Sequence, residues 1–172
     1  MQSNPTGNAA AAEVSLKILK SSSHSKLTGN FGEALVLYWL SKYGFECALV
    51  DHTGIDIIAR RPRSDEVMGI SVNSRSRIPR RADDYIRIPL DKVAKAQRAA
   101  DAFRCNPYFA IVVDAGNLIR VFIVSVSRLM TMHSRSSRQI GWKMRESDLA
   151  KYCADPEIKV FELETRTRKW WE

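Results

Sequence analysis

Apolar and polar positions follow two different periods along the chain, which predicts a mixture of helices and strands. Residues 27–43 are apolar at most positions between Phe31 and Leu40 and are followed by Gly44, which predicts a helix that ends at this glycine. Because the stretch is apolar nearly all round, we expect this helix to be buried. A second helix is predicted at residues 90–104. Its apolar face carries Val93, Ala96, Ala100 and Phe103.

Short apolar runs bounded by turns predict a sheet. Three runs follow the first helix, and their short polar connections favour an antiparallel meander. The predicted strands are residues 45–50, 55–59, 67–73, 108–114 and 118–126. A Ser/Arg-rich loop is expected at 132–139, then a helix at 146–152 and a last strand at 158–163. This order predicts an α/β fold in which helices flank a central mixed β-sheet.

The length and patterning favour one domain with two appendages. A chain of 172 residues fits a single domain of average size. We interpret residues 1–26 as a flexible N-terminal arm, 27–131 as the core and 132–172 as a C-terminal extension packed on it. No apolar run approaches the roughly 20 residues of a membrane span, and the first residues lack the pattern of a secretory signal. A cytoplasmic protein with no membrane partner is therefore expected.

The cysteines and histidines are scattered through the sequence. Cys47, Cys105 and Cys153 form no CxxC pair, so neither a zinc site nor a disulfide framework is expected. Buried, reduced thiols are the favoured interpretation.

Positive charge is concentrated in one stretch of the chain. The formal net charge is +8, and residues 60–98 hold 11 basic against 5 acidic residues. Arginine supplies 17 of the 27 positive charges, and its planar guanidinium binds phosphate oxygens in pairs. Such clustering favours a nucleic-acid partner over a solvated basic loop, and charge alone does not distinguish DNA from RNA. The candidate phosphate-binding residues are Arg75, Arg77, Arg80, Arg81 and Arg87.

A second basic group lies near the end of the sequence, beside two tryptophans. It consists of Arg166, Arg168 and Lys169, followed by Trp170 and Trp171. The tryptophans could serve a homodimer contact or pack on their own domain.

Two carboxylates interrupt apolar segments. Glu33 lies within the first predicted helix, where it completes a capping box if Asn30 is the N-cap, or else acts as a buried metal ligand or catalytic acid. Asp56 lies inside a β-branched strand, as a protective edge charge or as a metal ligand. Gly54, just before it, would let another backbone or a ligand approach closely.

The third predicted strand has one apolar and one small, polar face. Met68, Ile70 and Val72 share the apolar face. Gly69, Ser71, Asn73 and Arg75 share the other. Ser71 and Asn73 would lie on the same side as Asp56 if the strand register allows.

Taken together, Gly32-Glu33, Gly54-Ile55-Asp56 and the segment 69–75 resemble the PD-(D/E)XK nuclease superfamily, nearest to archaeal Holliday-junction resolvases and Mrr-like proteins. The likeness spans about residues 27–126 and implies a restriction-endonuclease-like core. It further implies a centre in which Glu33 and Asp56 hold Mg²⁺ or Mn²⁺, which generates hydroxide and stabilises the phosphoryl transition state. The pattern departs at two places, since Ser71 replaces the third acid and Asn73 replaces the lysine.

These departures favour a nuclease-fold protein that binds DNA and cleaves it poorly or not at all. The alternative is an active endonuclease with a rearranged site, in which Ser71 completes the metal shell and Arg75 stabilises the scissile phosphate. In that case Asp51 or Glu66 could supply a further carboxylate. A third hypothesis is an assembly module whose basic face binds an acidic protein.

Overall fold

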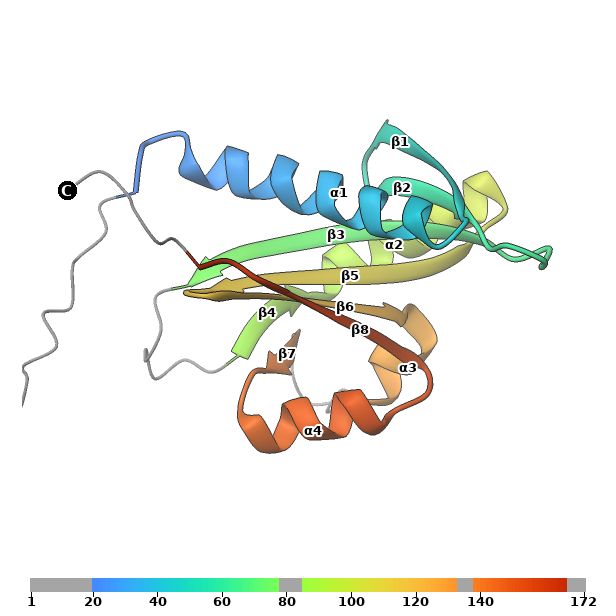
Figure 1. Ribbon diagram of the computed structural model, residues 1–172. Helices are drawn as coiled ribbons and strands as arrows, with labels where there is room; N and C mark the ends of the chain where they lie inside the picture. Colours follow the sequence, from blue (N-terminus) through green and yellow to red (C-terminus); the bar gives the residue numbers. More distant parts are fainter. Residues whose placement is uncertain (1–19, 78–84, 133–137, 167–172) are drawn as a thin grey trace, which may run out of the picture.

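A six-stranded mixed sheet with helices on both faces forms the centre of the molecule (Figure 1). The computed structural model describes residues 20–77, 85–132 and 138–166. The helices are α1 (His24–Lys42), α2 (Leu90–Phe103), α3 (Val126–Thr131) and α4 (Glu146–Ala154). The strands are β1 (Glu46–His52), β2 (Ile55–Arg60), β3 (Val67–Arg77), β4 (Tyr85–Pro89), β5 (Asn106–Ala115), β6 (Leu118–Ser125), β7 (Gln139–Lys143) and β8 (Ile158–Glu164).

The strand order in the sheet is β1-β2-β3-β5-β6-β8, and only β3 and β5 are paired in parallel. The predicted antiparallel meander of the first three strands is confirmed. The parallel pair requires a long crossover, which β4 and α2 supply. Because β8 pairs with β6, the predicted C-terminal extension contributes a strand to the central sheet.

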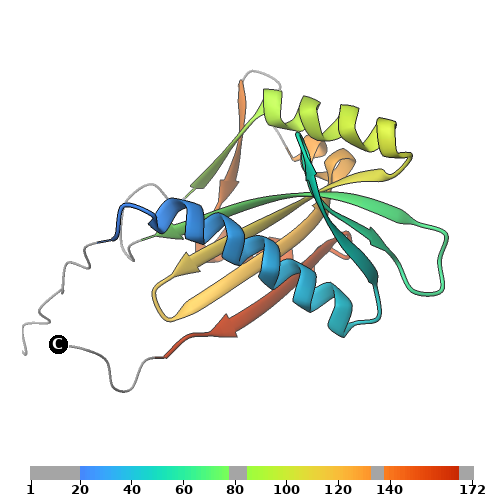
Figure 2. The same cartoon turned by 90° about the horizontal axis from the view of Figure 1, so that it is seen from above.

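Helix α1 lies alone across one face of the sheet (Figure 2). Its inner side, including Leu35, Val36 and Leu40, packs against apolar side chains of β2, β3, β5 and β6. The prediction that this helix is buried all round is wrong, because no element among the described residues covers its outer side. There Phe31 and Tyr38 are 45% and 60% exposed.

The start of α1 also differs from the prediction. The helix begins at His24, with Ser23 at the N-cap, rather than at Leu27. Residues 20–26 therefore belong to the described fold. Asn30 lies inside the helix and cannot be its N-cap, so the capping-box interpretation of Glu33 is wrong.

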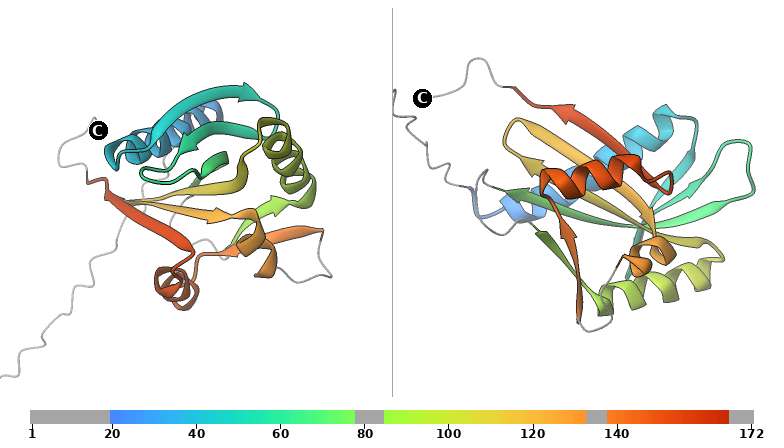
Figure 3. Two further views of the ribbon diagram at one scale, coloured as in Figure 1. Left: turned by 90° about the vertical axis from the view of Figure 1, so that its right-hand side faces the viewer. Right: turned by 90° about the horizontal axis from the view of Figure 1, so that it is seen from below.

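The opposite face carries the second apolar core, under α2, α3, α4 and a separate ribbon formed by β4 and β7 (Figure 3). Trp142 of β7 is buried and stacks on Tyr152 of α4 with 4.1 Å between ring centroids. The ribbon was not predicted, and β7 starts where a loop was expected. Its two strands have five residues each and pair only with one another across the fold.

Several local predictions can be checked directly. Gly44 and Gly116 have φ angles of +81° and +79°, at the predicted helix end and hairpin turn. The three cysteines are free, but none is fully buried as predicted, since Cys47 and Cys105 are half-buried and Cys153 is exposed. No helix among the described residues is long and apolar enough to cross a membrane.

Gly54 allows α2 to approach the start of β2. Its φ of +113° favours glycine, and a Cβ built there would lie 2.5 Å from the carbonyl oxygen of Lys95. The close approach to another backbone expected from the sequence is therefore present. It brings the first turn of α2, which carries Lys92, toward Asp56.

Candidate functional site

Asp56 lies where β2 and β3 separate. The regular pairing of these strands ends at Ile57 and Ile70. One residue before that point, Asp56 Oδ2 accepts a hydrogen bond of 2.6 Å from the backbone N–H of Val72. The carboxylate thus occupies the position that a backbone carbonyl would have if the ladder continued. Beyond it, β3 has an open edge on this side.

The two predicted metal ligands share one electrostatic environment. Burial raises the pKa of Asp56, and the hydrogen bond from Val72 and the charge of Lys92 partly offset this rise. Burial and, next, the charge of Asp56 raise the pKa of Glu33 on α1. Both carboxyl groups therefore bind protons more readily than ordinary ones. Glu33 and Asp56, the two residues that the family resemblance implies as metal ligands, therefore lie within electrostatic range of one another.

Strand β3 passes this pair with the alternation that was predicted. Met68, Ile70 and Val72 pack in the core under α1. Ser71 is half-buried, and Asn73 is only 3% exposed. The Nδ2 atom of Asn73 is buried and has no hydrogen-bond partner, which is a costly state for a polar group in a folded protein.

The side chains present do not match the metal centre that the family resemblance implies. In the described parts of the chain, no three His, Cys, Asp or Glu residues come together as a metal-binding group. One oxygen of Asp56 is already engaged by Val72. Ser71 is neutral, and so is Asn73, whose buried Nδ2 atom cannot ligate a cation.

Asp51 and Glu66, which could have supplied a further carboxylate, do not complete a metal-binding group with Glu33 and Asp56. Asp51 is exposed on β1. Glu66 precedes β3 and accepts hydrogen bonds from Tyr108 at 2.6 Å and Arg61 at 3.2 Å. It lies seven residues before Asn73, roughly 20 Å away along an extended strand.

The predicted arginines differ in their surroundings. Arg75 is exposed and donates to the carbonyl of Ser74. Arg77 donates to the carbonyl of Tyr85 at 3.5 Å, and Arg87 lies over the Tyr85 ring, 5.1 Å from its centroid. Arg80 and Arg81 lie outside the described residues, as do Arg168, Lys169, Trp170 and Trp171.

A cleft of about 660 Å³ runs along the second half of β3, between the start of α1 and the first turn of α2. Its cationic lining residues are Lys20, Arg75 and Lys92. Lys20 Nζ donates to the carbonyl and hydroxyl oxygens of Ser76, at 2.8 and 3.0 Å. Sequence reasoning missed both lysines. Lys92 reaches β3 only through the crossover, and Lys20 was assigned to the arm.

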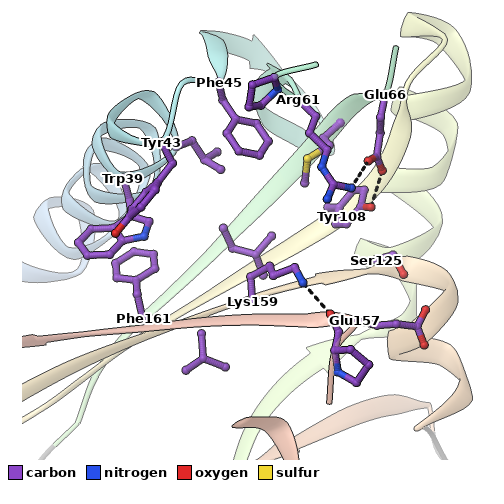
Figure 4. Close-up of a pocket in the computed structure, with 16 residues that line it drawn as sticks. Trp39, Tyr43, Phe45, Arg61, Glu66, Tyr108, Ser125, Glu157, Lys159 and Phe161 are labelled. Atoms are coloured by element: carbon purple, nitrogen blue, oxygen red, sulfur yellow. Dashed lines mark hydrogen bonds and ion pairs between the residues drawn. The ribbon is translucent and has the colours of Figure 1, made fainter. Parts of the chain in front are cut away.

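A second cavity, of about 690 Å³, lies on the face that carries α1, beyond its C-terminal end (Figure 4). Trp39 and Phe161 stack on one side, with 4.0 Å between ring centroids. On the other side burial and, next, the hydrogen bond to Glu66 raise the pKa of Tyr108 to about 12. The polar groups here pair with one another, so the cleft beside β3 is the better candidate for binding.

The fold resembles that of solved nucleases. No protein-family model and no curated protein matches the chain. The chain is similar to Archaeoglobus fulgidus Hjc, a Holliday junction resolvase from an archaeal hyperthermophile. The TM-score is 0.50 and the identity 21%, over 72% of this chain and 88% of that one. A weaker similarity links it to a restriction endonuclease in complex with substrate DNA, with a TM-score of 0.39 and 12% identity over 88% and 76% of the two chains. The similarity to Hjc confirms the predicted restriction-endonuclease-like fold.

Proposed function

We propose that this protein uses a nuclease fold to bind nucleic acid, with an impaired metal-dependent phosphodiesterase site. One observation carries the proposal. Where the family pattern has a third carboxylate and a lysine, β3 presents Ser71 and Asn73, and the neighbouring cleft is lined by cations.

The electrostatics of the site favour phosphate over a metal ion. The ammonium group of Lys92 stabilises the negative charge of Asp56, but it would repel a divalent cation bound there. Phosphate groups gain from the same positive charge.

DNA is the first nucleic acid to test, and a four-way junction the first shape. The similar protein from Archaeoglobus fulgidus is described as a Holliday junction resolvase. Fluorescence anisotropy with labelled duplex and four-way DNA in EDTA would measure affinity without metal. We expect Arg75→Ala to lower the slope of log K against log salt by about 1, as for one lost phosphate contact.

Arg120→Ala is the matched control, because Arg120 lies on β6 and pairs with Glu162 at 2.7 Å. Its salt slope should equal that of the unaltered protein. If the unaltered protein, Arg75→Ala and Arg120→Ala have equal salt slopes, Arg75 does not contact a phosphate. No binding at low salt would refute the proposed function.

A cleavage assay tests the state of the site. We expect the same DNA to stay intact in Mn²⁺, both with the unaltered protein and with Asp56→Asn. Cleavage that this substitution abolishes would instead establish an active Mg²⁺- or Mn²⁺-dependent endonuclease built on Glu33 and Asp56.

A further inference from the structure

Unpaired polar atoms gather at the cleft beside β3. Among the described residues, four side-chain nitrogen or oxygen atoms are buried without a hydrogen-bond partner, and three belong to residues that line this cleft. They are His24 Nε2, Asn73 Nδ2 and Ser74 Oγ. Ser74 Oγ lies against Gly32 beneath α1, which leaves Asn73 and His24 as groups available to a ligand.

The backbone of β3 adds donors at the same place. Val72 directs its N–H toward the side from which β2 has departed, where Asp56 accepts it. Because N–H directions repeat every second residue in a strand, Ser74 and Ser76 direct theirs toward the same open edge. Backbone N–H groups along such an edge suit an anion.

The charged side chains that line the cleft are cationic, and the carboxylates of Asp56 and Asp114 lie behind the lining, hydrogen-bonded to Val72 and Ser76. The lining includes the side chains of Lys20, Arg75 and Lys92, and no Asp or Glu is among the described residues that line the cleft. Lys20 is already held by two oxygens of Ser76, so part of the site is ordered before a ligand arrives. A donor-rich, cationic cleft of about 660 Å³ is large enough for a phosphate with its attached sugar.

We propose that this cleft binds one backbone phosphate of a nucleic acid strand directly, without a bridging metal ion, with Asn73 as a hydrogen-bond donor and Lys20 and Lys92 as counter-charges. The inference rests on the proposed function, because it names the group that the same site recognises. Asn73 and Lys92 then form a direct phosphate site in place of the family's third carboxylate and lysine.

Isothermal titration calorimetry with inorganic phosphate in EDTA tests the site on the unaltered protein. We expect saturable binding of one phosphate, weakened about tenfold by Lys92→Ala, the size expected for losing a charged hydrogen bond. Lys95→Ala is the control on the same helix, since Lys95 pairs with Asp91 at 3.3 Å and does not line the cleft. Equal affinities for the two variants would overturn the proposal.

Asn73→Leu separates binding from a structural role. Removing a buried, unpartnered donor should raise the melting temperature in the absence of phosphate and lower the affinity for phosphate. A substitution that only damaged the fold would lower both the melting temperature and the affinity for phosphate. A phosphate affinity unchanged in Asn73→Leu, or one that appears only when Mg²⁺ is added, contradicts the assignment.

Inorganic phosphate and DNA are measured side by side, so that the two proposals can fail separately. If DNA binds at low salt and inorganic phosphate does not, the phosphate site is refuted and the proposed function stands. If phosphate binds as expected and DNA does not, the proposed function is refuted instead, and the cleft is a site for a free phosphate compound.

Discussion

At the scale of single residues, Asp56 has the most unusual position. Its carboxylate takes the place of a backbone acceptor at the point where two strands part, and burial raises its pKa. A folded pKa above the ordinary value of 3.8 means that the folded state binds the proton more tightly than the unfolded state does. The contribution of Asp56 to stability is therefore greatest below about pH 3.8 and is lost as the pH rises through the folded pKa.

Asp56→Asn should make the protein more stable at pH 7, because asparagine keeps the acceptor for Val72 without a buried charge. We expect a melting temperature about 2 °C higher at pH 7 and little change at pH 3.5, measured by thermal denaturation. Asp65→Asn is the control, since Asp65 is fully exposed. If Asp56→Asn raised the melting temperature more at pH 3.5 than at pH 7, the raised pKa assigned to Asp56 would be contradicted.

Residues of the site could be predicted from the sequence only where they break a local pattern. Glu33 and Asp56 are charges inside apolar segments, and that anomaly identified them. Lys92 is an ordinary polar residue in the first turn of a helix. Its role comes from the crossover that places this turn beside β3, and nothing in its neighbouring residues indicates that.

At the scale of elements, glycine controls how closely α2 approaches the sheet. Gly54→Ala should lower the free energy of unfolding by about 3 kcal/mol, because a Cβ would meet the backbone of Lys95 at a φ of +113°. Gly29→Ala should raise it by about 1 kcal/mol, since that helical position has no atom within 4 Å of the new Cβ. Urea denaturation of both variants checks the difference. If both variants changed the free energy of unfolding equally, the packing of α2 would not depend on the missing side chain at Gly54.

The two sides of α1 should respond differently to the same truncation. Leu35→Ala removes a buried side chain and should cost about 3 kcal/mol. Phe31→Ala affects a side chain that is 45% exposed and should cost less than about 1 kcal/mol in the monomer. Chemical denaturation at low protein concentration provides both values. A large loss for Phe31→Ala that grows with protein concentration would instead indicate that a second copy covers this side.

Elements were predictable where their own residues carry the pattern. The strands β1, β2 and β3, and the hairpin of β5 and β6, have clear apolar runs bounded by polar or glycine-containing turns. The apolar pattern of α1 could not show which side faces the sheet, because both sides are apolar. The ribbon of β4 and β7 depends on pairing between segments about 50 residues apart, which no local pattern reports.

At the scale of the whole molecule, the net charge of +8 governs association with nucleic acid. If about four phosphates are contacted, affinity for DNA should fall about a hundredfold between 50 and 200 mM salt. Anisotropy titrations over that range measure the dependence. If the affinity for DNA stayed constant over this salt range, phosphate contacts would contribute little to binding. That result would favour the hypothesis of an assembly module.

The last strands of the fold have a consequence for its synthesis. Ile140, Trp142, Leu149, Tyr152 and Ile158 complete the core against β5 and β6, and β8 covers the free edge of β6. A chain emerging from the ribosome must expose these apolar surfaces until β8 has left the exit tunnel. The growing chain should therefore depend on chaperones until then and become resistant to proteases only after β8 has emerged.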